Sequence, residues 1–153
     1  MGTSGLIGSY QHAIDANGRL SIPARFRDYL RVLSHEIVIM TVIPVNPSVV
    51  AYPLSAWNEI TARAQQAQAT GVPRIKDFLS LFYSGAVECP LDKQGRILLP
   101  AELRTKAGLD RETTLIGCMN TFEVWDVNRW KQKEAQLLED SVGLQTAMAA
   151  LGL

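Results

Sequence analysis

Apolar residues recur along the chain at two spacings, and the change between them separates strands from helices. Alternating or β-branched runs indicate strands, because successive side chains of a strand face opposite sides. Such runs occupy residues 6–14, 20–22, 36–43, 49–52, 86–91, 96–99 and 114–125. The last run is long enough for two paired strands that meet around Met119 and Asn120.

Apolar residues three or four positions apart predict helices. The predicted helices span residues 23–33, 55–69, 75–83 and 101–107, and a last one begins near Asp126 and passes Leu138. Ser55 is expected to cap the second helix at its N-terminus, and Gly108 is expected to end the fourth. Segment 143–153 is weakly periodic and is expected to fray, and residues 1–5 are expected to form a disordered leader.

One pattern of residues occurs twice in the chain. The first copy, DANGRLSIPARFR, spans residues 15–27, and the second, DKQGRILLPAELR, spans residues 92–104. Six positions are identical, and the apolar positions between them match in kind. Because two copies are too few for a solenoid, they indicate a pseudo-symmetric fold in which each half supplies what the other lacks.

Each copy has the chemistry of a tight turn between two strands. Asp15 can accept hydrogen bonds from the backbone N–H groups that follow it. Gly18 can hold a positive φ without steric cost. Pro23 has no N–H to donate, so it ends the next strand and suits the first turn of a helix. The second copy repeats this order with Asp92, Gly95 and Pro100. Each copy therefore predicts β-turn-β followed by a short helix.

The distribution of charge also singles out the two copies. The chain has 153 residues with 15 basic and 15 acidic side chains, so its formal net charge is zero and no global field attracts nucleic acid. Both copies are nevertheless locally positive, and an arginine fork suits both phosphate and guanine. Arg19 and Arg96 stand at the turn exits, where their side chains can project past the hairpin. The alternative for these residues is a local ion pair that only braces each turn.

Other kinds of chemistry find little support. The length suits one domain with a substantial core. His12 and His35 lie far apart without a set of metal ligands, and no nucleophile has a plausible His and Asp pattern around it. No metal, cofactor, small-molecule substrate or enzymatic activity is therefore expected. Cys89 and Cys118 are expected to be reduced, buried thiols of a cytosolic protein. The apolar runs are too short to cross a bilayer, and no signal peptide is expected.

An aromatic pair follows each copy. Tyr52 stands five residues before Trp57, and Trp125 stands five residues before Trp130. These side chains are expected in the core, because they recur at equivalent positions on apolar faces. The first copy has four more residues than the second between its proline and the aromatic, and a surface turn around residues 44–50 is expected to hold them.

The duplicated D-x-x-G-R-x-x-x-P, the GSYQH segment at residues 8–12 and the aromatic pairs resemble the MraZ family, the two-repeat branch of the SpoVT/AbrB-like proteins. The resemblance covers nearly the whole chain. It implies an α+β fold: a pseudo-twofold double SpoVT/AbrB-like β-barrel, related to the swapped-hairpin barrel, with flanking helices and two βαββα-like repeats. The expected limits are 6–54 for the first repeat, 55–83 for connecting helices, 84–127 for the second repeat and 128–153 for the C-terminal helix and tail.

The resemblance also implies a function. It suggests a transcriptional regulator that binds tandem direct repeats of double-stranded DNA upstream of a bacterial division and cell-wall gene cluster. Ring-shaped homo-oligomers and a cytoplasmic, nucleoid-associated location are expected. Arg19 and Arg96 carry over as the DNA-contacting residues of the family. The full set of residues expected to contact DNA comprises Arg19, Arg96, Asn17, Lys93, Gln94, Arg25, Arg27 and Arg104.

The chain departs from the family pattern at two places, and both concern subunit contacts rather than the duplicated turn. Residues 1–7 replace the usual short Met-Phe-x-Gly start, and residues 44–50 carry the extra length. Two other hypotheses remain. The turns could make protein–protein contacts in a structural assembly module that binds no DNA, or the chain could be an AbrB-like antitoxin.

Overall fold

The computed structural model describes residues 4–33, 36–43 and 45–153. Within these ranges the strands are β1 (Ser9–Ala13), β2 (Arg19–Ser21), β3 (Ile37–Val42), β4 (Val49–Pro53), β5 (Val87–Pro90), β6 (Arg96–Leu98), β7 (Glu112–Gly117) and β8 (Phe122–Asp126). The helices are α1 (Ala24–Leu33), α2 (Leu54–Ala67), α3 (Ile75–Ser84), α4 (Ala101–Ala107), α5 (Val127–Glu139) and α6 (Ser141–Ala150), with a short 3₁₀ turn at Gln68–Thr70. An antiparallel sheet has the order β1-β7-β8-β4-β3-β5, and β2 and β6 pair separately. The α+β class and the double-repeat fold are confirmed.

A pseudo-twofold axis relates the two halves, as the strand registers show. In the β2–β6 pair, Leu20 lies opposite Ile97, and these are equivalent positions of the two copies. In the β4–β8 pair, Val50 lies opposite Glu123, and each stands two residues before the aromatic of its repeat. Both pairs are antiparallel and centred on equivalent residues, so the axis passes through both.

The repeats exchange their strands instead of forming the simple hairpins that the pattern predicted. The strand backbones on either side of each turn are linked only next to the turn itself in the described ranges: the Asp15 N–H donates to the Arg19 carbonyl, the Asp92 N–H donates to the Arg96 carbonyl, and Ile14 lies opposite Leu20. Further along, β1 pairs with β7 and β2 pairs with β6, both from the other repeat. Alternation determines which face of a strand is buried but not which strand becomes its partner, so the hairpin prediction was wrong beyond the turn.

The main core lies where the two copies of the pattern meet. Leu20 and Ile97 are fully buried at its centre. Phe26 of α1 packs against Phe122 of β8, with their rings 5.3 Å apart, so a helix of one repeat covers a strand of the other. In the same way α4 lies against β3 and β4. Burying a side chain of this size contributes about 1.5–3 kcal/mol, and most of that free energy depends on both repeats.

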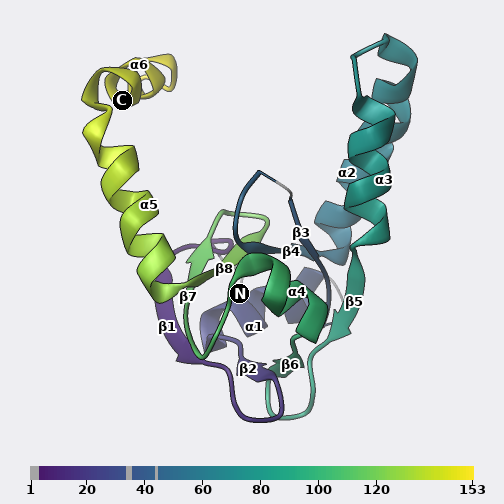
Figure 1. Ribbon diagram of the computed structural model, residues 1–153, viewed down its shortest axis with the longest axis vertical. Coiled ribbons are helices and arrows are strands. Elements are labelled where there is room, and N and C mark those ends of the chain that lie inside the picture. Colours follow the sequence, from purple (N-terminus) through teal and green to yellow (C-terminus); the bar gives the residue numbers. More distant parts are fainter. Residues whose placement is uncertain (1–3, 34–35, 44) are drawn as a thin grey trace.

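Two helical arms rise from the sheet at the end of the molecule opposite the turns of the repeated pattern (Figure 1). The first arm consists of α2 and α3, and Trp57 of α2 stacks on Phe82 of α3 with centroids 5.3 Å apart. The second arm consists of α5 and α6. Trp130 of α5 lies 5.5 Å from Trp125, which repeats the Tyr52–Trp57 pair at 5.8 Å. Tyr52 and Trp125 are buried, and both Trp57 and Trp130 are partly buried.

One helix end followed the predicted chemistry, one followed the predicted position, and two departed from the prediction. Gly108 ends α4 with φ 65°, and the Asp126 carboxylate accepts hydrogen bonds from the first N–H groups of α5. Ser55 does not cap α2, because the helix already begins at Leu54 with Pro53 in the capping position. The segment expected to fray forms α6, whose first turn is capped by the Asp140 carboxylate.

Other departures concern the N-terminus, the extra residues and the thiols. Gly5 is buried against Met119, so the leader prediction fails there, and residues 1–3 lie outside the described ranges, as do His35 and Pro44. The registers place two of the four extra residues before β3 and only two between β3 and β4. Cys89 is buried as expected, but Cys118 is exposed.

Candidate nucleic-acid interface at the paired turns

The first turn, residues 15–18, is held by its own aspartate. The Asp15 carboxylate accepts hydrogen bonds from the backbone N–H groups of Asn17 and Arg19, each at 2.9 Å. The Gly18 N–H donates to the Asp15 carbonyl at 3.0 Å, and Gly18 has φ 81°. The hydrogen bond from the Arg19 N–H is the main cause of a lowered pKa of Asp15. The carboxylate is therefore ionised and fixes the loop.

The second turn, residues 92–95, has the same geometry. The Asp92 carboxylate accepts from the N–H groups of Gln94 at 2.8 Å and Arg96 at 2.9 Å. Gly95 has φ 75°. Hydrogen bonding from Arg96 lowers the pKa of Asp92 as well. Asp15, Gly18, Asp92 and Gly95 thus occupy equivalent positions in two equivalent turns.

The two turns are fastened to each other by reciprocal backbone hydrogen bonds. The Leu99 N–H donates to the Gly18 carbonyl at 2.9 Å, and the Ile22 N–H donates to the Gly95 carbonyl at 3.0 Å. The turns consequently lie side by side at one end of the molecule (Figure 1). A ligand that touches one turn is close to the other.

The last arginine of each copy reaches across to the opposite turn. Arg27 of α1 fills the space where a β-carbon of Gly95 would stand. Arg104 of α4 lies over Gly18, with its Nη2 3.2 Å from the corresponding β-carbon position, and its Nε donates to the Leu99 carbonyl at 3.2 Å. Both arginines are partly buried. They therefore support the turns, whether or not they also reach a ligand.

The two turn-exit arginines have different partners. The Arg96 Nε donates to the Asp92 carboxylate at 3.0 Å, and its Nη1 lies 3.9 Å from the Asp15 carboxylate. The ion-pair brace is therefore present at Arg96. Arg19, by contrast, makes no side-chain ion pair with any residue in the described ranges. Its guanidinium is the freer of the two cations.

The remaining predicted contact residues are solvent-exposed. Asn17 stands at the tip of the first turn, and Lys93 and Gln94 stand at the tip of the second. Arg25 is exposed on the first turn of α1. The structure thus brings both tips and both exit arginines to one end of the molecule, with Arg27 and Arg104 behind them.

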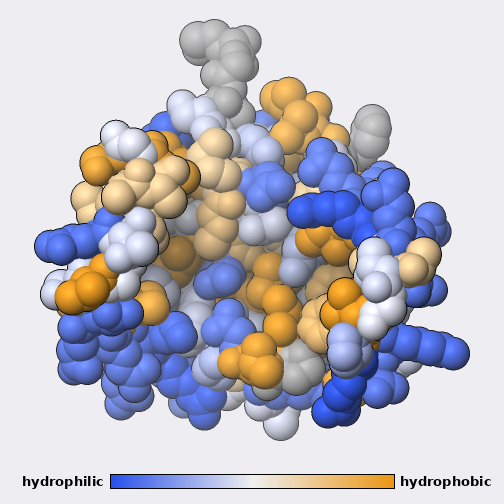
Figure 2. Space-filling model, turned by 90° about the horizontal axis from the view of Figure 1, so that it is seen from above, coloured by the Kyte–Doolittle hydropathy of each residue, from blue (hydrophilic) through white to orange (hydrophobic). Residues whose placement is uncertain are grey.

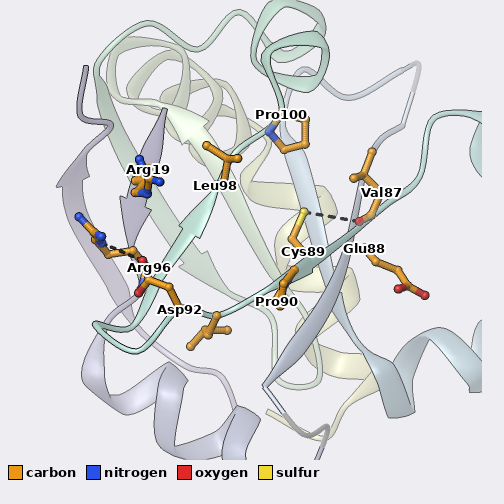
Figure 3. A pocket seen from close by; sticks show the side chains of 10 residues that line it. Arg19, Val87, Glu88, Cys89, Pro90, Asp92, Arg96, Leu98 and Pro100 are labelled. Atoms are coloured by element: carbon orange, nitrogen blue, oxygen red, sulfur yellow. Dashed lines mark hydrogen bonds and ion pairs between the residues drawn. The ribbon is translucent and has the colours of Figure 1, made fainter. Parts of the chain in front are cut away.

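Beside the turns lies a hollow that sequence reasoning did not predict. It has a volume of about 510 Å³ and lies between β5 and the β2–β6 pair (Figure 3). Leu98 and Val87 face it from the two strands, and Arg19 stands at one end. Leu98 is 58% exposed, which is unusual for a leucine at a strand position. The exposure of Leu98 could not be predicted from the sequence, because alternation does not show whether a face of a strand is covered by other residues or exposed to solvent.

No group of three or more His, Cys, Asp or Glu side chains in the described ranges could hold a metal ion. Among the described helices, none has the length and apolar character required to span a bilayer.

The interleaved repeats and the fastened turns define a double-repeat, SpoVT/AbrB-like protein of the α+β class. The chain matches the family described as "MraZ protein, putative antitoxin-like" over residues 6–77 and again over residues 82–151. The chain therefore belongs to the MraZ family, as the resemblance indicated.

Curated relatives extend over most of the chain, and each bears the name "Transcriptional regulator MraZ". The relative from Tolumonas auensis is 38% identical over 128 residues, which cover 84% of either chain. The one from Moorella thermoacetica is 40% identical over 82% of this chain and 84% of its own. The one from Desulfitobacterium hafniense is 37% identical over 96% of this chain and 99% of its own. The family is one of transcriptional regulators, which confirms the prediction that the chain is not an enzyme.

Proposed function

We propose that the chain is a sequence-specific, DNA-binding transcriptional regulator and that its paired turns contact double-stranded DNA. The observation that carries this proposal is the joining of two arginine-bearing turns, each fixed by an ionised aspartate, at one end of the molecule. Fixed backbone and projecting arginines limit the entropy lost on binding. The relatives' names support the same role.

The residues divide into contact and support roles. Arg19 has the freer guanidinium of the two exit arginines and is the principal contact, because its fork can bind a phosphate or a guanine edge. Arg96 makes the equivalent contact while Asp92 holds its orientation. The tips add polar contacts, and the supporting arginines lie behind them. The proposed contact set beyond the two exit arginines comprises Asn17, Lys93, Gln94, Arg25, Arg27 and Arg104.

Assembly of several copies is the second part of the proposal. All residues of α6 are exposed, and isolated helices this short are marginal in water. Leu144 and Met148 are among its exposed apolar side chains, and Leu151, directly after the helix, is exposed as well. Seen from the end that carries the arms, apolar side chains gather on both arms around a hollowed centre (Figure 2). Association of several copies through their arms would bury these apolar side chains.

The pseudo-symmetry of the arms supports a head-to-tail contact. In the first arm, α3 packs against α2 and Ala64 is buried. Leu137 occupies the equivalent position of α5 and is 45% exposed. A surface that one repeat covers internally is thus open on the other. Heterologous contacts of this type close into rings when the rotation permits.

Assembly also answers the problem of affinity. The net charge is zero, so one pair of turns has little electrostatic attraction for DNA. Linking several pairs makes each further contact intramolecular, and avidity can then rise by about 10²–10⁴. A ring would present its turns at regular intervals. We therefore propose tandem direct repeats as the operator, upstream of a bacterial division and cell-wall gene cluster, and a nucleoid-associated location.

The test begins with selection of bound sites from random duplex DNA by the full chain. Duplexes carrying one, two or three copies of the selected site then measure how affinity depends on repeat number and on salt, while light scattering gives the mass. We expect an oligomer larger than a dimer whose affinity rises steeply with repeats and falls with salt. Failure to select any site, with no retention on heparin or DNA resin at low salt, would instead indicate an assembly module. A monomer that binds one repeat as tightly as three would refute the avidity argument.

A further inference from the structure

The two repeats differ at the flank of their turns, and the difference opens the hollow beside β5. In the first repeat, His12 Nδ1 of β1 lies 2.5 Å from the Ser21 carbonyl of β2, which links the two strands. The equivalent residue of β5 is Cys89. Its shorter side chain is buried in the main core, and its Sγ donates to the carbonyl of Val87 in its own strand at 3.6 Å. Within the described part of the chain no hydrogen bond joins the Cys89 side chain to β6, and the space of about 510 Å³ lies between the strands (Figure 3).

A second substitution between the repeats makes this space apolar. Leu98 of β6 takes the place of Ser21 and lines the hollow together with Val87, which is 38% exposed. Pro90 and Pro100 contribute further apolar surface. Pockets for small ligands have this composition, mostly apolar with a few convergent polar groups, and volumes of about 300–1,000 Å³.

The polar groups of the hollow determine the charge of its ligand. Asp92 and Arg96 are already paired with each other at 3.0 Å. Glu88 lies on the opposite flank, toward solvent (Figure 3). Arg19 is left at the end of the hollow, without an ion pair in the described part of the chain. A single anionic group is therefore complementary to this end, and an apolar body is complementary to the rest.

We propose that this hollow binds a small amphiphilic anion, whose carboxylate engages Arg19 and whose apolar chain packs against Leu98, Val87 and Pro90. The same guanidinium is the principal DNA contact of the proposed function. If the proposed function holds, the ligand and DNA compete for Arg19. The hollow would then connect the regulator to the supply of an acyl carboxylate.

The direct test uses octanoate as the probe and 1-octanol as its neutral counterpart of equal chain length. Both are titrated into the full-length protein while calorimetry records affinity and methyl NMR follows Val87 and Leu98. We expect octanoate to shift both methyl groups and to bind about tenfold or more tightly than octanol, because a hydrogen bond to a charged group distinguishes them. Absence of octanoate binding, or shifts confined to other methyl groups, would overturn the proposal.

Variants of the lining residues separate recognition of the carboxylate from recognition of the apolar chain. Arg19→Gln should reduce octanoate affinity to that of octanol, and Arg63→Gln is the matched control, since Arg63 is an exposed arginine of α2 that does not line the hollow. Leu98→Ser copies Ser21 of the other repeat and should weaken both probes. Cys89→His copies His12 and should close the hollow. If Arg19→Gln and Leu98→Ser both bind octanoate like the parent protein, the site is wrong.

Two further measurements identify other occupants and test the competition. If protein concentration rather than octanoate shifts the Val87 and Leu98 methyl groups, another copy of the chain fills the hollow and the proposal fails. In the second measurement, octanoate should release a selected DNA duplex in proportion to its occupancy. Octanoate binding without release would overturn the competition at Arg19. A protein that bound octanoate but no DNA at all would contradict the proposed function instead.

Discussion

Arg27 lies directly over Gly95, in the space that a β-carbon would need, although the two residues belong to different repeats. The equivalent contact in the other repeat places Arg104 over Gly18. The identical last arginine of the two copies thus has a structural reason: each repeat holds the other's turn. The Nε of Arg27 is buried without a hydrogen-bond partner in the described ranges, which fits a side chain placed by packing.

Substitution of either turn glycine should destabilise the protein. Gly18→Val and Gly95→Val force a β-branched residue into positive φ and, at Gly95, against Arg27. We expect each to lower the free energy of unfolding by more than about 1 kcal/mol, with Gly95→Val the larger. Gly71→Val is the control, because Gly71 has φ 73° but nothing within 4 Å of its β-carbon position. Thermal melts in which the turn variants match Gly71→Val would contradict the cross-repeat contact.

Removing the exit arginines should separate binding from stability. Arg19→Ala should weaken binding to selected DNA by about 1–3 kcal/mol per contact and leave the melting temperature unchanged. Arg96→Ala should weaken binding too and lose the partly exposed ion pair with Asp92, worth about 0–1 kcal/mol. Fluorescence anisotropy and thermal melts measure the two effects. Arg63→Ala on the first arm is the control, because it removes the same charge far from the turns. Normal DNA binding by Arg19→Ala would contradict the role of Arg19 as a DNA contact.

A charge placed on α6 should reduce assembly without unfolding the core. Leu144→Glu together with Met148→Glu places two charges on the exposed apolar face of α6, where burial against another copy would be costly. We expect a lower mass in light scattering, an unchanged far-UV spectrum and the loss of the gain in affinity with repeat number. Gln145→Glu adds a charge to the same helix at a polar position and serves as control. An unchanged mass for the double variant would exclude α6 from the interface.

The conformational stability of the two turns should depend on pH only at acidic pH. The pKa values of Asp15 and Asp92 lie below 3.8 in the folded chain, mainly because the N–H groups of Arg19 and Arg96 donate to the carboxylates. A lowered pKa means that this stabilisation is complete above pH 3.8 and is lost as the pH falls through the folded values. Because the intrinsic rate of amide exchange itself rises with pH, the quantity to measure is the protection of the Arg19 and Arg96 amides relative to that rate, and this protection should fall only there. Asp15→Asn should remove the dependence at Arg19 alone, and a loss of protection near neutral pH would contradict this account.

Much of the fold could be predicted from the sequence, because local chemistry determines it. Alternation and periodicity located the principal strands and helices, including the start of α5 near Asp126, and Gly108 marked the end of α4 through its capping chemistry. Strand partners could not be derived from the pattern: Leu20 alternates in the same way whether β2 pairs with β1 or with β6. The resemblance to a known family supplied the exchanged topology, and α6 was missed since its apolar residues face no core.

The residues of the candidate site could be predicted from the sequence, but the contacts between the two repeats could not. The turns follow from Asp15 and Gly18, whose chemistry is local. The support of Gly95 by Arg27 depends on a contact between residues far apart in sequence, so the pattern could indicate only that Arg27 is duplicated. The limits proposed for the two repeats stay a prediction, and the DNA contacts await the binding measurements.

The interleaving of the repeats has a consequence for the order of events during synthesis. Ser9 pairs with Ile116, so β1 has no partner until most of the chain has left the ribosome. β2 likewise waits for β6. Contacts of such sequence separation slow folding and leave unpaired strands exposed meanwhile. The N-terminal half made alone should therefore either stay unfolded or pair with a second copy of itself, since the register around Leu20 would accept an identical strand in place of β6.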